Sequence, residues 1–243
     1  MKYLLEPKNG KWVAAQNDLT SAEIKTKILA ADVCISDLDD TDTDSPAKEI
    51  AKRAIGIEFD PLGYLTWGIG TTVSLIKNGK NGETERWRQY VHTFLKFPGS
   101  RAQVSALFNP EKVRNSLYPG VEEFYASIPA AKFYLTRNIK EVADVYGNVL
   151  GFTGVISEAF YKEKAIQEFL INHSQFQRYV VRGDSDEDQM VLDVLRFQQR
   201  ERKIESVTGI YHADSPSSRH LNSVFEINVG KDQRGLVGLL RLF

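Results

Sequence analysis

The chain has 243 residues, which is enough for one large domain or for a core domain with a smaller insert. Hydrophobic residues make up 42% and charged residues 26%, as in an ordinary globular protein, and the single cysteine excludes an internal disulfide. The formal net charge of −1 provides no basic field that would favour nucleic acid or an anionic membrane as a partner.

The amino-terminal segment is expected to form short strands and then a helix. Apolar pieces at Tyr3–Leu5 and Trp12–Ala15 flank the turn dipeptide Asn9-Gly10, which could join two small strands. A helix is expected from about Ser21 to Ala30. The first apolar piece is far too short for a signal-peptide core and no later run approaches a membrane span, so we expect a cytoplasmic protein.

A cluster of acidic residues follows the apolar strand expected over residues 32–36. Asp37, Asp39 and Asp40 lie within four positions, where like charges repel one another unless a cation offsets them. Mg²⁺ suits such a cluster, because it binds carboxylate oxygens and commonly shares its coordination shell with a substrate phosphate. Since open α/β sheets bind ligands beyond the carboxyl ends of their strands, Asp37 and Asp39 are expected at one sheet edge. A calcium loop is excluded, because neither register supplies the required Gly and Glu.

The span from Ala47 to about Leu117 has a mostly helical pattern, with apolar residues at three- and four-residue spacing. Turn signals at 78–82 and 98–100 divide it, and we expect a helical insertion. A further helix, starting near residue 120, leads to an apolar run over 133–135 that stops at Thr136.

Helices and strands alternate through the rest of the chain. Helical patterns near 139–145, 162–172 and 187–201 are interleaved with apolar runs over 179–181, 207–211 and 225–229. This alternation predicts an α/β fold with a doubly wound, mostly parallel sheet and right-handed crossovers. Three of the strands end in polar residues that could hold phosphate and metal.

With these motifs in this order, the sequence resembles the haloacid dehalogenase-like (HAD) superfamily of hydrolases, which are mostly Mg²⁺-dependent phosphatases with a Rossmann-like core. The first motif is a hydrophobic strand followed by Asp-x-Asp-x-Thr, and the second is a strand ending in Thr or Ser. The third is a lysine at the start of a helix, and the fourth is Gly-Asp-x-x-x-Asp after a strand. They match, in turn, Asp37–Thr41, Thr136, Lys162 or Lys164, and Gly183–Asp188.

The resemblance implies a division of labour between two carboxyl groups. Asp37 would be the nucleophile that forms an aspartyl-phosphate, and Asp39 would protonate the leaving oxygen and later activate water. Thr136 would donate a hydrogen bond to a phosphoryl oxygen. Lys162 would neutralise the phosphate and the nucleophile, with Lys164 as the alternative.

The resemblance also implies a Mg²⁺ site. The ion would be held by the carboxylates of Asp37 and Asp184 and by the backbone carbonyl of Asp39. Asp188 would hold a metal-bound water or orient its neighbours. The chain departs from the family at Asp40 and Asp42, where Gly and an apolar residue are common, and both would add negative charge near the mouth of the site.

The resemblance finally implies a domain organisation and an activity. Residues 1–45 and 118–243 would form the HAD-like core, and 46–117 would form a helical cap of the C1 type inserted after the first core strand. Such a cap favours a small phosphorylated metabolite as substrate, which predicts a phosphoric monoester hydrolase with no nucleic acid or membrane partner. The alternatives are a phosphotransferase or mutase that uses the same intermediate, and a non-catalytic binding module on this scaffold.

Overall fold

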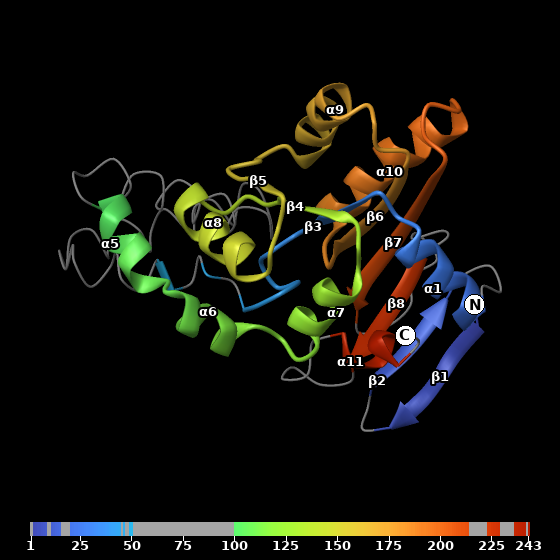
Figure 1. Ribbon diagram of the computed structural model, residues 1–243, viewed down its shortest axis with the longest axis horizontal. Helices are drawn as coiled ribbons and strands as arrows, with labels where there is room; N and C mark the ends of the chain where they lie inside the picture. The colour runs from blue at the N-terminus through green and yellow to red at the C-terminus, as the bar shows by residue number, and fades with distance from the viewer. Residues whose placement is uncertain are drawn as a thin grey trace, which may run out of the picture. The chain divides into compact units, whose positions relative to one another are not determined.

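The computed structural model describes residues 2–8, 11–15, 20–44, 46, 49–50, 100–213, 223–228, 236–241 and 243 (Figure 1). The chain divides into two compact units, a core unit of Met1–Asp44 with Pro110–Phe243 and an inserted unit of Ser45–Asn109. The core unit resumes at Pro110, ahead of the boundary expected at residue 118, and therefore includes helix α6 (Pro110–Ser116). In the inserted unit α5 (Ser100–Leu107) is described, while most of the expected helical cap lies outside the described residues.

The described strands form one eight-stranded sheet in the order β1-β2-β8-β7-β6-β3-β4-β5. Strands β3 to β8 pair with one another in parallel, while β2 pairs antiparallel with both β1 and β8. The predicted α/β fold with a mostly parallel sheet is confirmed. The strands are β1 (Lys2–Lys8), β2 (Lys11–Ala15), β3 (Val33–Ser36), β4 (Ala131–Leu135), β5 (Gly154–Ile156), β6 (Arg178–Gly183), β7 (Ser206–Ala213) and β8 (Ser223–Asn228).

The helices of the core unit lie on both faces of this sheet (Figure 1). Helix α9 (Lys162–Asn172) packs against β4 and α10 (Asp186–Arg200) against β6 and β7, while α8 (Lys140–Val149) packs against β4 and β5. None of the helices in the described part of the chain combines the length and apolar character that a membrane span requires. The remaining bounds are α1 (Ser21–Leu29), α7 (Val121–Ser127) and α11 (Val237–Leu240).

Alternation of side chains along the strands gives the sheet an apolar face toward α9 and α10. Every second residue of β3, β4 and β6 points toward helices α9 and α10, where these side chains form one buried cluster. Burial of this cluster is the main stabilising contribution on that face, because it removes large aliphatic and aromatic side chains from water. Its strand members include Val33, Ile35, Phe133, Leu135, Tyr179 and Val181, and its helix members include Ile166, Phe169, Val191, Leu192 and Leu195.

The opposite face carries a buried ion pair between Arg182 on β6 and Asp42. Both side chains are fully buried, and the guanidinium also donates to the carbonyl oxygen of Thr41, at 2.8 Å, and contacts the ring of His212. The hydroxyl of Tyr134 donates to Asp42 Oδ2 at 2.6 Å. Burial raises the pKa of Tyr134 well above its ordinary value, so this phenol stays protonated and remains a donor.

This pairing corrects the expectation for Asp42. The sequence suggested that its carboxylate adds negative charge near the mouth of the site, but the side chain is fully buried and its charge is balanced by Arg182. The error arose because the partner lies on β6, 140 residues further along the chain.

We expect Arg182→Met to lower the free energy of unfolding by about 3–5 kcal/mol, because it leaves the buried Asp42 carboxylate without its partner. The double variant Asp42→Leu/Arg182→Met should lose less than Arg182→Met alone, since no buried charge then remains. Urea unfolding of the three proteins measures both differences.

The matched control is Arg178→Met at the start of the same strand. Arg178 pairs with Asp32 at 2.6 Å in a partly exposed setting, so its loss should cost at most about 1 kcal/mol. Equal losses for Arg178→Met and Arg182→Met would contradict the importance of the buried pair.

Candidate active site

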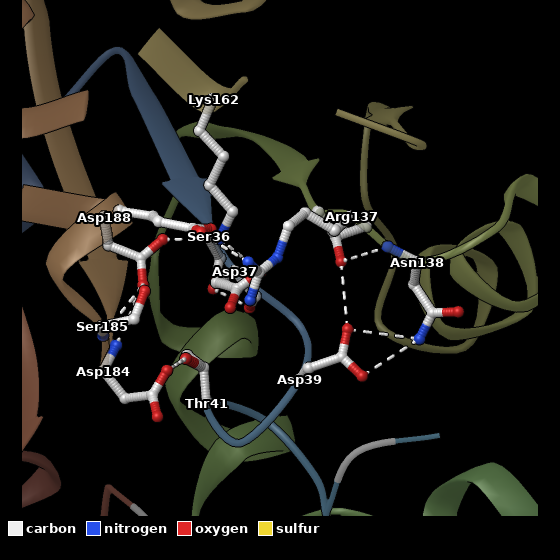
Figure 2. Close-up of polar contacts among 12 residues, drawn as sticks. Ser36, Asp37, Asp39, Thr41, Arg137, Asn138, Lys162, Asp184, Ser185 and Asp188 are labelled. Carbon is white, nitrogen blue, oxygen red and sulfur yellow. Dashed lines mark hydrogen bonds and ion pairs between the residues drawn. The ribbon is translucent and has the colours of Figure 1, made fainter. Parts of the chain in front are cut away.

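Three neighbouring strands bring the predicted site residues to one edge of the sheet. Asp37 directly follows β3, Thr136 follows β4, and Asp184 follows β6. Because β3 lies between β4 and β6 and all three run parallel, their carboxyl ends meet at the same edge. Asp37 therefore occupies the centre of the group in Figure 2, with Asp39 on one side and Asp184 on the other.

Lys162, the first residue of α9, binds two of the carboxylates. Its Nζ lies 2.8 Å from Asp37 Oδ1 and 2.7 Å from Asp188 Oδ1, and the side chain is almost completely buried. Lys164 is exposed instead, with its Nζ 4.9 Å from the centre of the Tyr161 ring. Of the two candidate lysines, only Lys162 is placed at the carboxylate cluster.

Burial makes the charges of this cluster strongly interdependent. Desolvation, together with the nearby charges of Asp188, Asp39 and Asp184, raises the pKa of Asp37 well above its ordinary value, and Lys162 partly opposes this increase. Burial alone would lower the pKa of Lys162, but the charges of Asp188 and Asp37 and the hydrogen bonds to both outweigh it and raise the pKa. Lys162 therefore stays positively charged between its two partners.

The carboxylates of Asp37, Asp184 and Asp188 form a group that could hold a metal ion. Each offers an oxygen atom within 4.8 Å of the others. Carboxylate oxygens at this spacing suit a hard divalent cation, which would offset the negative charge that Lys162 leaves uncompensated. The carboxylate of Asp39 is not part of this group. From the sequence, only the backbone carbonyl of Asp39 was expected as a metal ligand.

Asp188, in the first turn of α10, is held in place by the two residues that precede the helix. Its Oδ2 accepts hydrogen bonds from the backbone amides of Asp184 and Ser185, at 3.2 and 3.1 Å, and from the Ser185 hydroxyl at 2.7 Å. These bonds satisfy amides at the helix start and leave Oδ1 facing Lys162. The carboxylate crosses so close to Gly183 that a Cβ there would lie 2.3 Å from Asp188 Cγ.

Asp39 is oriented by two residues that follow β4. Asn138 Nδ2 donates to both carboxylate oxygens, at 3.1 and 3.2 Å, and the Thr136 hydroxyl donates to Oδ2 at 3.3 Å. Thr136 was expected at the site from the sequence, whereas Asn138 was not. The available signal for Asn138 was an amide side chain three residues after the strand end, which is too common in loops to single out a site residue.

A second residue that the sequence analysis did not single out is Arg137. Its Nη1 lies 2.5 Å from Glu187 Oε1, so an ion pair joins the loop after β4 to the first turn of α10. Both side chains are partly exposed, at 29% and 35%.

The turn after β3 explains how Asp40 can occupy the position where Gly is common in the family. This residue has a φ of 56°, in the left-handed region that glycine enters easily and that Asp and Asn tolerate better than most residues. Its backbone amide donates to the carbonyl of Thr43 at 2.8 Å, which reverses the chain. The reversal brings the Thr41 hydroxyl within 3.2 Å of Asp184 Oδ1, so the loops after β3 and β6 are joined.

Comparisons by sequence find no matching family model and no matching curated protein. Among solved structures, the chain is similar to cytosolic 5′-nucleotidase IIIB bound to cytidine, with a TM-score of 0.56 and 13% identity over 97% of this chain and 94% of that chain. It is also similar to a probable phosphoserine phosphatase from Vibrio cholerae in its unliganded form. That match has a TM-score of 0.52 and 15% identity over 86% of this chain and 64% of that chain. The chain has the haloacid dehalogenase-like fold.

Within the HAD-like fold, the four sequence motifs occupy one connected site. The first and second motifs meet through the hydrogen bond between Thr136 and Asp39. The third and fourth meet through the ion pair between Lys162 and Asp188, and Lys162 also contacts Asp37 of the first. These contacts bring together motifs that are up to 151 positions apart in the sequence, from Asp37 to Asp188.

We expect Gly183→Ala to lower the free energy of unfolding by about 1–3 kcal/mol, because the added Cβ must displace the Asp188 carboxylate or the adjoining backbone. In a protein that already carries Asp188→Ala, the same glycine substitution should cost less than about 1 kcal/mol, since the atoms it meets are gone. Denaturant unfolding of all four proteins gives this cycle. A loss of equal size in both backgrounds would show that the close approach to Asp188 is not its cause.

Proposed function

We propose that this protein is a Mg²⁺-dependent phosphatase that hydrolyses a small phosphomonoester through an aspartyl-phosphate on Asp37. The observation that carries the proposal is the Lys162 ammonium, which is buried between the carboxylates of Asp37 and Asp188 at the carboxyl end of β3. A buried cation beside a carboxylate is an arrangement suited to bringing a dianionic phosphate against a negatively charged nucleophile.

In the first step, a carboxylate oxygen of Asp37 bonds to phosphorus as the bond between phosphorus and the leaving oxygen breaks. Lys162 offsets the repulsion between the phosphate and the nucleophile, which is otherwise a large part of the barrier. Asp39 gives its proton to the leaving oxygen, so that an alcohol departs rather than an alkoxide.

In the second step, water attacks phosphorus, Asp39 takes its proton, and the bond to Asp37 breaks to release inorganic phosphate. Asp39 must hold a proton at one stage and lack it at the other. The Thr136 hydroxyl suits both states, because an oxygen 3.3 Å from Asp39 Oδ2 can donate to the carboxylate or accept from the carboxylic acid. Asn138 fixes the orientation of the carboxyl group throughout.

Bound Mg²⁺ would supply charge neutralisation for the transferring phosphoryl group. We assign its ligands to the carboxylates of Asp37 and Asp184 and the backbone carbonyl of Asp39, with Asp188 close enough to hold a coordinated water. The hard oxygen donors of this group fit Mg²⁺ better than metals that prefer nitrogen or sulfur. Asp188 also keeps Lys162 in position. Substitution of Asp188 should therefore disturb both the bound Mg²⁺ and the Lys162 ammonium.

The substrate is proposed to be a small phosphorylated metabolite. The nucleotidase and the probable phosphoserine phosphatase with similar folds are named for substrates of this size. The inserted unit interrupts the core between β3 and β4, and we propose that it acts as a cap that selects the leaving group. A substrate of this kind is consistent with the cytoplasmic location expected from the sequence.

We expect release of inorganic phosphate from p-nitrophenyl phosphate in the presence of Mg²⁺. Asp37→Asn should lower kcat by about 10³-fold or more, because the amide is a far poorer nucleophile. EDTA should abolish activity and excess Mg²⁺ should restore it. A colorimetric phosphate assay measures each rate, and a panel of phosphorylated metabolites then identifies the substrate.

The lysines provide a matched control for this assay. Lys162→Ala should remove most of the activity, while Lys164→Ala, two residues along the same helix and exposed, should leave it near the starting value. Full activity in Asp37→Asn would reject the assigned nucleophile, and loss of activity in Lys164→Ala alone would reject the assigned lysine.

We expect the apparent affinity for Mg²⁺ to fall as the pH is lowered from neutrality. Burial and the neighbouring carboxylates raise the pKa of Asp37, so the proton that must leave before its carboxylate can bind metal is retained at higher pH than for an ordinary Asp. Metal binding should therefore release protons, which calorimetric titration in buffers of different ionisation enthalpy detects. Asp37→Asn cannot titrate at this position and should show weaker binding with a smaller pH dependence.

A further inference from the structure

The ion pair between Arg137 and Glu187 lies at the carboxyl edge of the sheet, close to the candidate active site. Arg137 comes two residues after the end of β4, and Glu187 lies in the first turn of α10, after β6. Since β3 lies between β4 and β6, a bond between these residues crosses the carboxyl end of β3, where Asp37 is located. Figure 2 shows the Arg137 side chain extending from the β4 side toward Asp37.

The setting of this ion pair makes the guanidinium available for exchange. Both side chains are about one-third exposed, so water screens the pair and its net stabilisation is small. A phosphoryl group carries up to two negative charges and matches the planar donors of a guanidinium in a bidentate manner. It can therefore compete with the single charge of Glu187 for Arg137.

The charge balance of the site favours this exchange when a phosphate arrives. The site contains three carboxylates, those of Asp37, Asp184 and Asp188, and the ammonium of Lys162. An incoming dianion adds to this negative charge, and each further cation that can turn toward it lowers the repulsion. While Glu187 is its partner, Arg137 contributes almost no net positive charge there.

We infer that Arg137 is a phosphate-binding residue and that Glu187 is its internal competitor, held across the end of β3 until a phosphoryl group displaces it. This inference rests on the proposed function for the identity of the anion. In the bound state the guanidinium contacts phosphoryl oxygens, and Glu187 is released toward water. When inorganic phosphate leaves, Glu187 recovers Arg137, which weakens product binding and favours release.

Calorimetric titration of inorganic phosphate in the presence of Mg²⁺ tests this inference. Arg137→Ala should raise the Kd for phosphate about tenfold, because a charge-assisted hydrogen bond is lost. Glu187→Gln should lower the Kd about threefold, the range of a partly exposed ion pair. In the Arg137→Ala background, Glu187→Gln should change the Kd by much less, because its effect is transmitted through the guanidinium.

Two further variants and one comparison separate this mechanism from simpler ones. Asp193→Asn removes a carboxylate from the same helix, where Asp193 is mostly exposed, and should leave the Kd unchanged. Arg137→Lys should recover part of the affinity lost in Arg137→Ala, which a role in folding alone would not predict. An equal tightening by Glu187→Gln with and without Arg137 would overturn the exchange, since it would show general repulsion by the Glu187 charge.

The outcomes also separate this inference from the proposed function. Phosphate release by the unaltered protein together with an unchanged Kd in Arg137→Ala would overturn the role of Arg137 alone. The expected pattern of Kd values without turnover of any phosphomonoester would support Arg137 as an oxyanion-binding residue and reject the phosphatase. Failure of the unaltered protein and of Glu187→Gln to bind phosphate would overturn the role of Arg137, whatever the phosphate-release assay shows.

Discussion

The site depends on one buried ammonium group. Lys162 lies between Asp37 and Asp188 and connects the end of β3 to the starts of α9 and α10. Two carboxylates could not be buried together at this edge without it, because their desolvation and mutual repulsion would favour protonation or exposure. The same ammonium group that allows the two carboxylates to be buried would also supply positive charge to a bound phosphate, so the structure and the proposed chemistry depend on one interaction.

A second buried cation supports the loop that carries the acids. The backbone carbonyl of Arg182 accepts a hydrogen bond from the Asp37 amide at 2.9 Å, and its side chain holds Asp42 and the carbonyl of Thr41. One residue of β6 therefore fixes both ends of the turn that contains Asp39. Lys162 pairs with Asp37 at the start of this loop, and Arg182 pairs with Asp42 five residues later.

The parts of the site that the sequence predicted are those set by local pattern. Each strand end that is followed by Asp37, Thr136 or Asp184, and the lysine at a helix start, is visible in its own stretch of a few residues. Contacts between distant segments were not visible, which is why Asn138 was missed and the charge of Asp42 was misjudged. Strand β5 was also missed, since three residues are too few to give a periodic signal, whereas the two small amino-terminal strands and the longer helices were predicted correctly.

The antiparallel hairpin of β1 and β2 has a consequence for self-association. Because β2 pairs with β8 along its length, the backbone amides and carbonyls on that flank of the parallel strands are already occupied. At the other margin of the sheet stands β5, whose three residues offer very little backbone to a foreign strand. Exposed margins of sheets can recruit further chains. The short β5 limits this at one margin, and at the other the outermost strand is β1, which contains Pro7 and pairs irregularly with β2.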